Sequence, residues 1–198
     1  PMALLRSVIY LLWQIVTVVP YAIATLVASI FVRGDPLYWI CVQWLRVVVW
    51  GAKVFCGIET RVQGMEHVPD SPIILCPKHQ SAWETLAFPT LMPHPLCYVF
   101  KRELLWVPFF GWAIGRLDMI HIDRSKRNLA WSKVAEQGKR FMEHGNWVIM
   151  FPEGTRTPVG MHRRYKVGGA HLAVETGVPL VPVALNAGEF WSRRAFIK

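Results

Sequence analysis

A histidine and a glutamate five residues apart are the best candidates for chemistry in this chain. His79 and Glu84 lie in the segment KHQSAWE at 78–84, directly after an apolar run that ends at Pro77. Imidazole is suited to taking a proton near neutral pH, and a nearby carboxylate fixes its tautomer and stabilises the imidazolium. No G-x-S-x-G elbow accompanies the pair. We therefore interpret it as an acid-base dyad that lacks a nucleophile of its own.

The position of the following helix decides whether the two side chains can meet. On one continuous helix, a separation of five residues would place them about 140° apart. Ser81 and Glu84 have the S-x-x-E spacing of a capping box, which predicts a helix that starts at Ser81 and leaves His79 in the loop before it. From that loop, the ring can turn back onto Glu84. The spacing fits equally well a plain helix cap at Glu84 beside an ordinary loop histidine.

A second polar cluster, FPEGTRT at 151–157, follows another apolar run. Gly154 permits a tight turn whose backbone N–H groups face an anion, and Arg156 offers a guanidinium that binds phosphate through two hydrogen bonds. A glycine turn with a surface arginine is common, and alone it indicates only a turn.

Two further clusters place cations after predicted strands. Lys101-Arg102-Glu103-Leu104 follows the run 96–100, and Ile122-Asp123-Arg124 ends the run 119–122. Polar groups after parallel strands gather at one edge of an α/β sheet. If the strands are parallel here, the sequence predicts the His79 and Glu84 pair beside Lys101, Arg124 and Arg156.

The elements between the clusters predict an α/β fold. Short β-rich runs alternate with helical stretches, and a glycine follows the longest helix as a C-cap. The predicted strands are 72–76, 96–100, 119–122, 147–151 and 180–185, and the predicted helices are 82–88, 126–144 and 166–177. We expect a mixed, partly parallel sheet flanked by helices.

The N-terminal region predicts contact with a membrane. Residues 7–32 carry no charge and are long enough to cross a bilayer, and they lack the pattern of a removable signal peptide. Pro20 would kink a single span or mark the bend of a re-entrant hairpin. Residues 37–55 form a second apolar helix, either at the membrane or in the core of the soluble domain. Two helices lying in or under one leaflet is the preferred arrangement.

Composition limits the classes of protein. A chain of 198 residues accommodates one catalytic α/β domain and a short appendage, which we divide into 1–56 and 57–198 with an incomplete C-terminus. A hydrophobic content of 53% indicates contact with lipid, and a net charge of +9 suits an anionic membrane, a phosphorylated substrate or nucleic acid. The glycine fingerprints of P-loop and dinucleotide enzymes are absent. The four cysteines have no metal-binding or redox spacing, and we expect them to be reduced.

Taken together, the ordered motifs resemble those of the glycerolipid acyltransferase family, and within it most closely the 1-acyl-sn-glycerol-3-phosphate acyltransferases. The resemblance covers residues from about 57 to 190. It is carried by His79-x4-Glu84, the Lys101 to Leu104 motif, Gly115 to Arg124, Phe151 to Arg156 and VPLVPV at 178–183. The usual carboxylate in the first motif is Asp, and here Glu84 is one methylene longer.

The resemblance implies roles for individual residues. It makes His79 the general base and Glu84 its partner. It assigns six residues to the acceptor-phosphate site, namely Lys101, Arg124, Glu153, Gly154, Thr155 and Arg156. Helix N-terminal amides near Ser81 would stabilise the oxyanion.

The resemblance also implies substrates and a location. The donor would be acyl-CoA or acyl-carrier protein, the acceptor lysophosphatidic acid and the product phosphatidic acid, with no resident cofactor or metal and no nucleic-acid partner. The protein would lie at a membrane, the inner membrane if it is bacterial, with its catalytic domain facing the cytosol. A different acceptor remains open, such as glycerol-3-phosphate or a lyso-ornithine-type lipid, as does a non-enzymatic module that binds anionic lipid. The sequence leaves the oligomeric state open.

Overall fold

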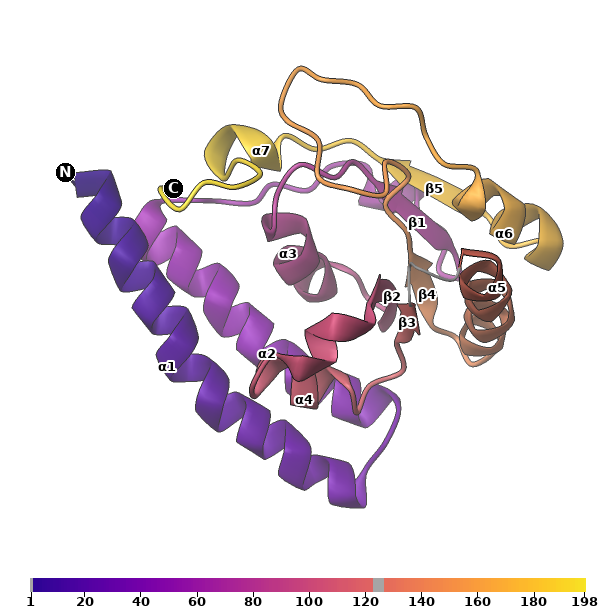
Figure 1. Ribbon diagram of the computed structural model, residues 1–198, viewed down its shortest axis with the longest axis horizontal. Coiled ribbons are helices and arrows are strands. Elements are labelled where there is room, and N and C mark those ends of the chain that lie inside the picture. The colour runs from indigo at the N-terminus through magenta and orange to yellow at the C-terminus, as the bar shows by residue number, and fades with distance from the viewer. Residues whose placement is uncertain (1, 123–126) are drawn as a thin grey trace.

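The computed structural model describes residues 2–122 and 127–198, and its centre is a five-stranded sheet (Figure 1). The strands are β1 Ile74–Pro77, β2 Leu96–Lys101, β3 Ile120–Ile122, β4 Trp147–Ile149 and β5 Leu180–Val183, in the order β3-β2-β4-β1-β5. Each described pairing is parallel. The α/β class is confirmed, whereas the sheet that the sequence predicted to be mixed is parallel throughout the described residues.

Helices follow most of the strands. They are α3 Trp83–Leu91, α4 Phe110–Ile114, α5 Arg127–Glu143, α6 Gly168–Thr176 and α7 Ala187–Phe190, with short 3-10 helices at Met65–His67 and Arg102–Trp106. The helices predicted at 82–88, 126–144 and 166–177 correspond to α3, α5 and α6. The sequence did not predict the two short helices between 102 and 114, where Pro108, Gly111 and Gly115 interrupt any helical period.

The core around the sheet has two parts, because successive side chains of a strand point to opposite faces of the sheet. Ile74 of β1 and Val148 of β4 pack with residues of α5 and α6 on one face. Leu75 and Trp147 pack on the other face with residues of α2 and α3. The central strands β1 and β4 are therefore covered on both faces, as is typical of parallel sheets, whereas β5 at one edge is partly exposed. A third buried cluster, with Tyr10, Val48 and Trp83 among its members, lies where the N-terminal helices meet α3.

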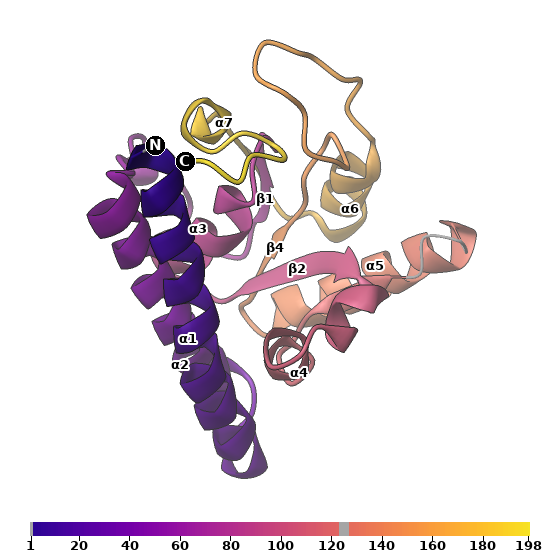
Figure 2. The same cartoon turned by 60° about the vertical axis from the view of Figure 1, so that its left-hand side comes forward.

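Two long helices precede the sheet: α1 Met2–Phe31 and α2 Asp35–Gly51, which continues as a π-helix over Ala52–Cys56. Helix α1 runs on through Pro20, so the chain does not reverse there. It reverses instead at 32–34, where Gly34 adopts a φ of 64°. The helices lie side by side (Figures 1 and 2).

Helix α2 lies between α1 and the sheet domain. Towards α1, its Val48 carbonyl accepts a hydrogen bond from Tyr10 Oη at 3.2 Å, and its Trp44 Nε1 donates to Thr17 Oγ1 at 3.1 Å. On the opposite side, Tyr38 and Val42 are buried in the core of the sheet domain. The interpretation of 37–55 as a core helix is therefore correct for its inner face.

The outer face of α1 is apolar and exposed. Both α1 and the segment Asp35–Cys56 are long and apolar enough to cross a membrane by length and composition. The large exposed hydrophobic residues of α1 include Leu12, Ile15, Val16, Val27, Ile30 and Phe31. These residues would meet lipid more readily than water. The division of the chain at residue 56 stays a prediction.

The four cysteines are free, as expected for reduced thiols. Cys76 of β1 and Cys97 of β2 are buried in the sheet. Burial raises the pKa of the Cys76 thiol to about 11 and that of Cys97 further still. Both thiols are therefore protonated and behave as small apolar side chains.

Candidate active site

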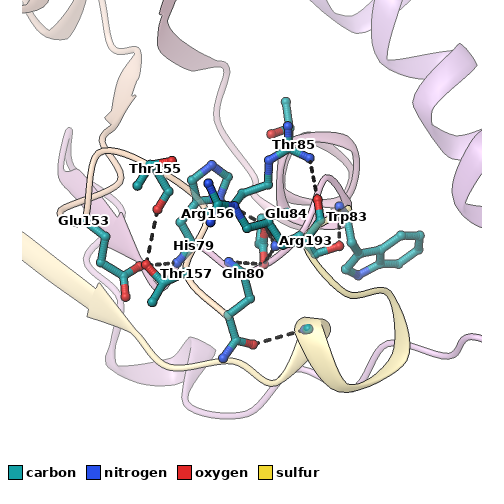
Figure 3. A network of polar contacts seen from close by, with 12 residues as sticks. His79, Gln80, Trp83, Glu84, Thr85, Glu153, Thr155, Arg156, Thr157 and Arg193 are labelled. Atoms are coloured by element: carbon teal, nitrogen blue, oxygen red, sulfur yellow. Dashed lines mark hydrogen bonds and ion pairs between the residues drawn. The ribbon is translucent and has the colours of Figure 1, made fainter. Parts of the chain in front are cut away.

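The loop between β1 and α3 brings the predicted dyad together (Figure 3). Strand β1 ends at Pro77 and α3 begins at Trp83, two residues after the predicted start at Ser81. His79 therefore precedes the helix, and its Nδ1 lies 3.2 Å from Oε2 of Glu84. The Glu84 side chain is 1% exposed and that of His79 is 15% exposed. The carboxylate is buried while the ring reaches the surface.

Backbone amides hold the Glu84 carboxylate in place. Gln80 N donates to Oε1 at 3.0 Å, and Ser81 N lies 2.9 Å from each oxygen. Such donors compensate for the burial of the charge. Half of the predicted capping box is thus formed, because Ser81 Oγ accepts from Trp83 N at 3.1 Å rather than from Glu84 N.

These contacts contradict one prediction in part. The amides near Ser81 were expected to stabilise an oxyanion. The amides of Gln80 and Ser81 are bound to Glu84, and that of Trp83 is bound to Ser81 Oγ. These three amides hold the Glu84 carboxylate and the start of the helix, and are not free for a substrate.

The backbone and ring of His79 are fixed from several sides. His79 N donates to Oε2 of Glu153 at 2.7 Å, and the His79 carbonyl accepts from Thr157 N at 2.7 Å. The imidazole stacks on the Phe151 ring with centroids 3.9 Å apart and planes 20° apart. Because an ionised Glu84 only accepts, Nδ1 carries the hydrogen and Nε2 is left with a lone pair for a substrate proton.

The turn after β4 supplies these supports. Gly154 closes the turn through a hydrogen bond from its N–H to the Phe151 carbonyl at 2.9 Å, with a φ of 67° that favours glycine. Glu153 is 3% exposed, and its second oxygen, Oε1, pairs with the Lys78 ammonium. Glu153 was assigned to the phosphate site, but each of its carboxylate oxygens is bound within the protein, Oε1 to Lys78 and Oε2 to His79 N.

Arg156 and Thr155 lie on the outer part of the same turn. Arg156 is exposed, and its Nη1 donates to the Arg193 carbonyl at 3.2 Å. The Thr155 carbonyl accepts from Thr157 Oγ1 at 3.4 Å. The guanidinium keeps other N–H groups for a ligand, since arginine has five.

Lys101 and Arg124 are the two remaining cations of the predicted site, and the structure describes the first of them. Lys101 is the last residue of β2, at the same carboxyl edge as the other clusters, and its side chain is exposed. Arg124 lies outside the described residues. The structure thus brings the clusters after β1 and β4 into direct contact and places Lys101 at their edge of the sheet.

Three supporting residues were not assigned a role from the sequence. Lys78 neutralises Glu153, Phe151 stacks on His79, and Gln80 Oε1 accepts from Gly188 N at 3.1 Å. Lys78 and Phe151 lie within the motifs, so their positions weakly indicated a role in the site. The contact of Gln80 with Gly188 joins residues 108 positions apart, and no sequence pattern indicates it.

An apolar cavity lies between the N-terminal helices and the sheet domain. Thr85 and Leu86, which directly follow Glu84, form part of its wall. Thr85 and Leu86 aside, most of the lining comes from α1, α2, β2 and α4, with Tyr21, Val42, Phe100 and Phe110 as examples. A cavity of this composition suits a hydrocarbon chain rather than a polar group.

This geometry is suited to general-base chemistry, with exposed cations at the same edge of the sheet that could bind an anionic group and an apolar cavity that could hold a hydrocarbon chain. A family model described as Acyltransferase matches residues 59–186. The chain belongs to this acyltransferase family.

Sequence relatives support the same placement. The chain is 46% identical over 156 residues to a 1-acyl-sn-glycerol-3-phosphate acyltransferase of Pseudomonas aeruginosa, covering 79% of this chain and 60% of the relative. It is 32% identical to the protein of that name in Escherichia coli, over 70% of this chain and 54% of the relative. The human 1-acyl-sn-glycerol-3-phosphate acyltransferase alpha is 34% identical, over 72% and 51%. The chain thus spans about half to three fifths of the length of these relatives.

A solved structure has the same fold. The 1-acyl-sn-glycerophosphate (LPA) acyltransferase PlsC from Thermotoga maritima superposes with a TM-score of 0.76 over 98% of this chain and 79% of that protein, at 24% identity. The match extends over the N-terminal helices as well as the sheet.

Proposed function

We propose that this protein transfers a fatty acyl group from an acyl thioester to the 2-hydroxyl of 1-acyl-sn-glycerol-3-phosphate and so produces phosphatidic acid. The observation that carries the proposal is the contact of His79 Nδ1 with the buried Glu84 carboxylate at 3.2 Å. Membership in the acyltransferase family and the names of the relatives support the choice of reaction.

In the proposed reaction, His79 Nε2 takes the proton of the 2-hydroxyl while the oxygen attacks the thioester carbonyl. The C–O bond forms, the C–S bond breaks, and the imidazolium returns its proton to the leaving thiolate. Glu84 stabilises the imidazolium between these steps. General-base catalysis of this kind contributes about 10² to 10⁴ in rate, and orientation of the substrates adds to it.

The acceptor phosphate would bind at the cationic part of the edge. Lys101, Arg124 and Arg156 are the proposed phosphate ligands, since cations at this position attract a phosphate and arginine binds it through two hydrogen bonds. Glu153 and Gly154 would serve that site indirectly, by shaping the turn that carries Thr155 and Arg156.

The donor would be acyl-CoA or acyl-carrier protein, neither of which needs a resident cofactor. An acyl chain of donor or acceptor would occupy the apolar cavity next to Thr85. The exposed apolar face of α1 would lie in a membrane, with the catalytic domain on the cytosolic side of the inner membrane if the protein is bacterial. Arg33 and the basic charge of the following domain support that orientation.

The test is an assay of the purified protein in detergent, with lipid products identified by mass spectrometry. Acceptors are lysophosphatidic acid, glycerol-3-phosphate and a lyso-ornithine lipid, each with acyl-CoA and with acyl-carrier protein. We expect phosphatidic acid from lysophosphatidic acid as the main product. His79→Ala should fold with an unchanged melting temperature and form no product.

Other results would change the proposal in defined ways. Product mainly from glycerol-3-phosphate or from the ornithine lipid would replace the acceptor. Substantial turnover by His79→Ala would refute the mechanism. Binding of anionic vesicles with no acyl transfer to any acceptor would leave only a lipid-binding module.

A further inference from the structure

Lys166 lies at the end of a long loop, where the chain again contacts the turn that carries Glu153 and Gly154. After Thr157 the backbone runs outward as the loop between the site and α6 (Figure 1). It comes back where Lys166 N donates to the Pro152 carbonyl at 2.8 Å. This hydrogen bond fixes the backbone of residue 166 beside the turn that carries Glu153 and Gly154.

The Lys166 side chain crosses the face of Gly154. A Cβ atom added at Gly154 would lie 2.6 Å from Lys166 Nζ, 2.7 Å from Cε and 3.0 Å from Cδ. The end of the lysine therefore occupies the space that any side chain at position 154 would fill. A glycine here serves the turn through its φ of 67° and also leaves room for this ammonium group.

Lys166 Nζ pairs with no carboxylate among the residues that the structure describes. The adjacent carboxylate, Glu153, is bound to Lys78 and to His79 N. Within residues 2–122 and 127–198, neither the ion pairs nor the side-chain hydrogen bonds include Lys166 Nζ. The side chain is exposed. A cation without a partner in the described part of the chain is thus held against Gly154, the residue that follows Glu153.

The other cations of the loop lack these features. Arg163 and Arg164 are exposed, as most charged loop residues are, and neither is among the atoms nearest to Gly154 nor bonded through its backbone N–H to the described part of the turn. A solvated surface lysine would behave like them. The backbone anchor and the close approach to Gly154 distinguish Lys166 and limit where its ammonium can lie.

We propose that Lys166 binds the phosphate of the acceptor lipid, together with Arg156 of the same turn. This proposal rests on the proposed function, because it concerns the phosphate-bearing acceptor. The lysine supplies a point charge beside the directional guanidinium of Arg156. Acceptor binding would bring together one cation from the turn and one from the chain that returns to it.

The experiment compares Lys166→Met with the wild type in detergent micelles. Methionine keeps the length of the stem and removes the charge. We expect the dissociation constant and the KM for lysophosphatidic acid to rise about tenfold, as for a lost charge-assisted hydrogen bond of about 1.4 kcal/mol. The KM for acyl-CoA, kcat and the binding of monoacylglycerol, which has no phosphate, should change less than about twofold.

Two matched variants complete the experiment. Lys166→Arg keeps the charge and should recover most of the affinity. Arg164→Met removes a cation of the same loop and should leave lysophosphatidic acid binding unchanged. An equal loss in Arg164→Met would show a long-range field effect, and an equal rise in the KM for acyl-CoA would assign Lys166 to phosphates of the donor. Either result overturns the proposal.

Separate measurements of lysophosphatidic acid binding and of its acylation distinguish a failure of the Lys166 proposal from a failure of the proposed function. If the wild type binds lysophosphatidic acid but does not acylate it, the proposed function fails and the binding data still judge Lys166. If it binds and acylates, and Lys166→Met changes neither, the role of Lys166 alone is refuted. A wild type that does not bind lysophosphatidic acid refutes both.

Discussion

The two parts of the candidate site differ in how completely the protein itself satisfies their polar groups. Around His79, the described hydrogen bonds use the backbone N–H and carbonyl, ring Nδ1 and both oxygens of Glu84. In the cationic part, Arg156 has one contact to a carbonyl, and Lys101 and Lys166 are exposed. The proposed base is thus arranged before a substrate arrives, whereas the proposed phosphate subsite would be completed by the substrate. Preorganisation of this kind is expected where charge develops in the transition state.

Glu84→Ala should have the largest effect on this comparison. It removes the partner of His79 and leaves the buried amides of Gln80 and Ser81 without an acceptor. We expect kcat to fall about 100-fold and the free energy of unfolding to fall by about 1 to 3 kcal/mol. Steady-state kinetics and chemical denaturation measure the two losses.

Glu84→Asp is the matched control, since Asp is the residue usual in the related motif. It keeps the charge, and we expect it to retain activity within about tenfold. If neither Glu84→Ala nor Glu84→Asp alters kcat, the carboxylate only caps the helix.

Glu153→Ala should have the next largest effect, mostly on stability. It leaves the ammonium of Lys78, which is 18% exposed, and the His79 N–H without their acceptor. Removing one partner of a buried pair costs about 3 kcal/mol, and we expect kcat to fall about tenfold as the His79 backbone loosens. Denaturation midpoints and kcat test this.

A double variant separates charge from position at the same pair. Lys78→Met with Glu153→Gln removes both charges but keeps an oxygen that can accept from His79 N. It should be more stable than Glu153→Gln alone. If it is not, the pairing of Lys78 with Glu153 contributes nothing to the stability of the turn.

Arg156→Ala should act on substrate affinity with little effect on stability. Its only described contact is to the Arg193 carbonyl at the surface. We expect the KM for lysophosphatidic acid to rise about tenfold or more, and the melting temperature and the KM for the thioester to change little. Equal increases in both KM values would argue against the assignment of Arg156 to the acceptor.

Gln80→Ala should have the smallest effect on activity. Its side chain accepts from Gly188 N at 3.1 Å, while the Gln80 amide that holds Glu84 belongs to the backbone and survives the substitution. We expect stability to fall by about 1 kcal/mol and kcat to change less than about twofold. A large loss of kcat with full stability would give this side chain a direct part in catalysis.

The sequence predicted the features that depend on local pattern. The five strands, helices α3, α5 and α6, and the position of His79 ahead of α3 follow from apolar runs, turn residues and the S-x-x-E spacing. Glu84 also bonds the Ser81 amide as that spacing predicts. The roles proposed for His79 and Glu84 in catalysis stay predictions.

The features that the sequence missed depend on contacts between distant segments. Glu153 meets the His79 amide across 74 residues, and Lys166 reaches Gly154 only after the chain has made an excursion and returned. The spacing cannot show whether Glu153 contacts a substrate or instead holds the backbone of His79. The amides near Ser81 were assigned to an oxyanion for the same reason, since the spacing could not show that Glu84 and the Ser81 hydroxyl already use them.

The position of α2 has a practical consequence for work on this protein. Tyr38 and Val42 of that helix share one buried cluster with Leu75 and Trp147 of the sheet. Deleting the N-terminal helices to obtain a water-soluble catalytic fragment would therefore uncover the interior of the remaining domain. Purification should retain both helices and replace the bilayer with detergent or a lipid disc, because removal of the membrane segment also removes part of the core.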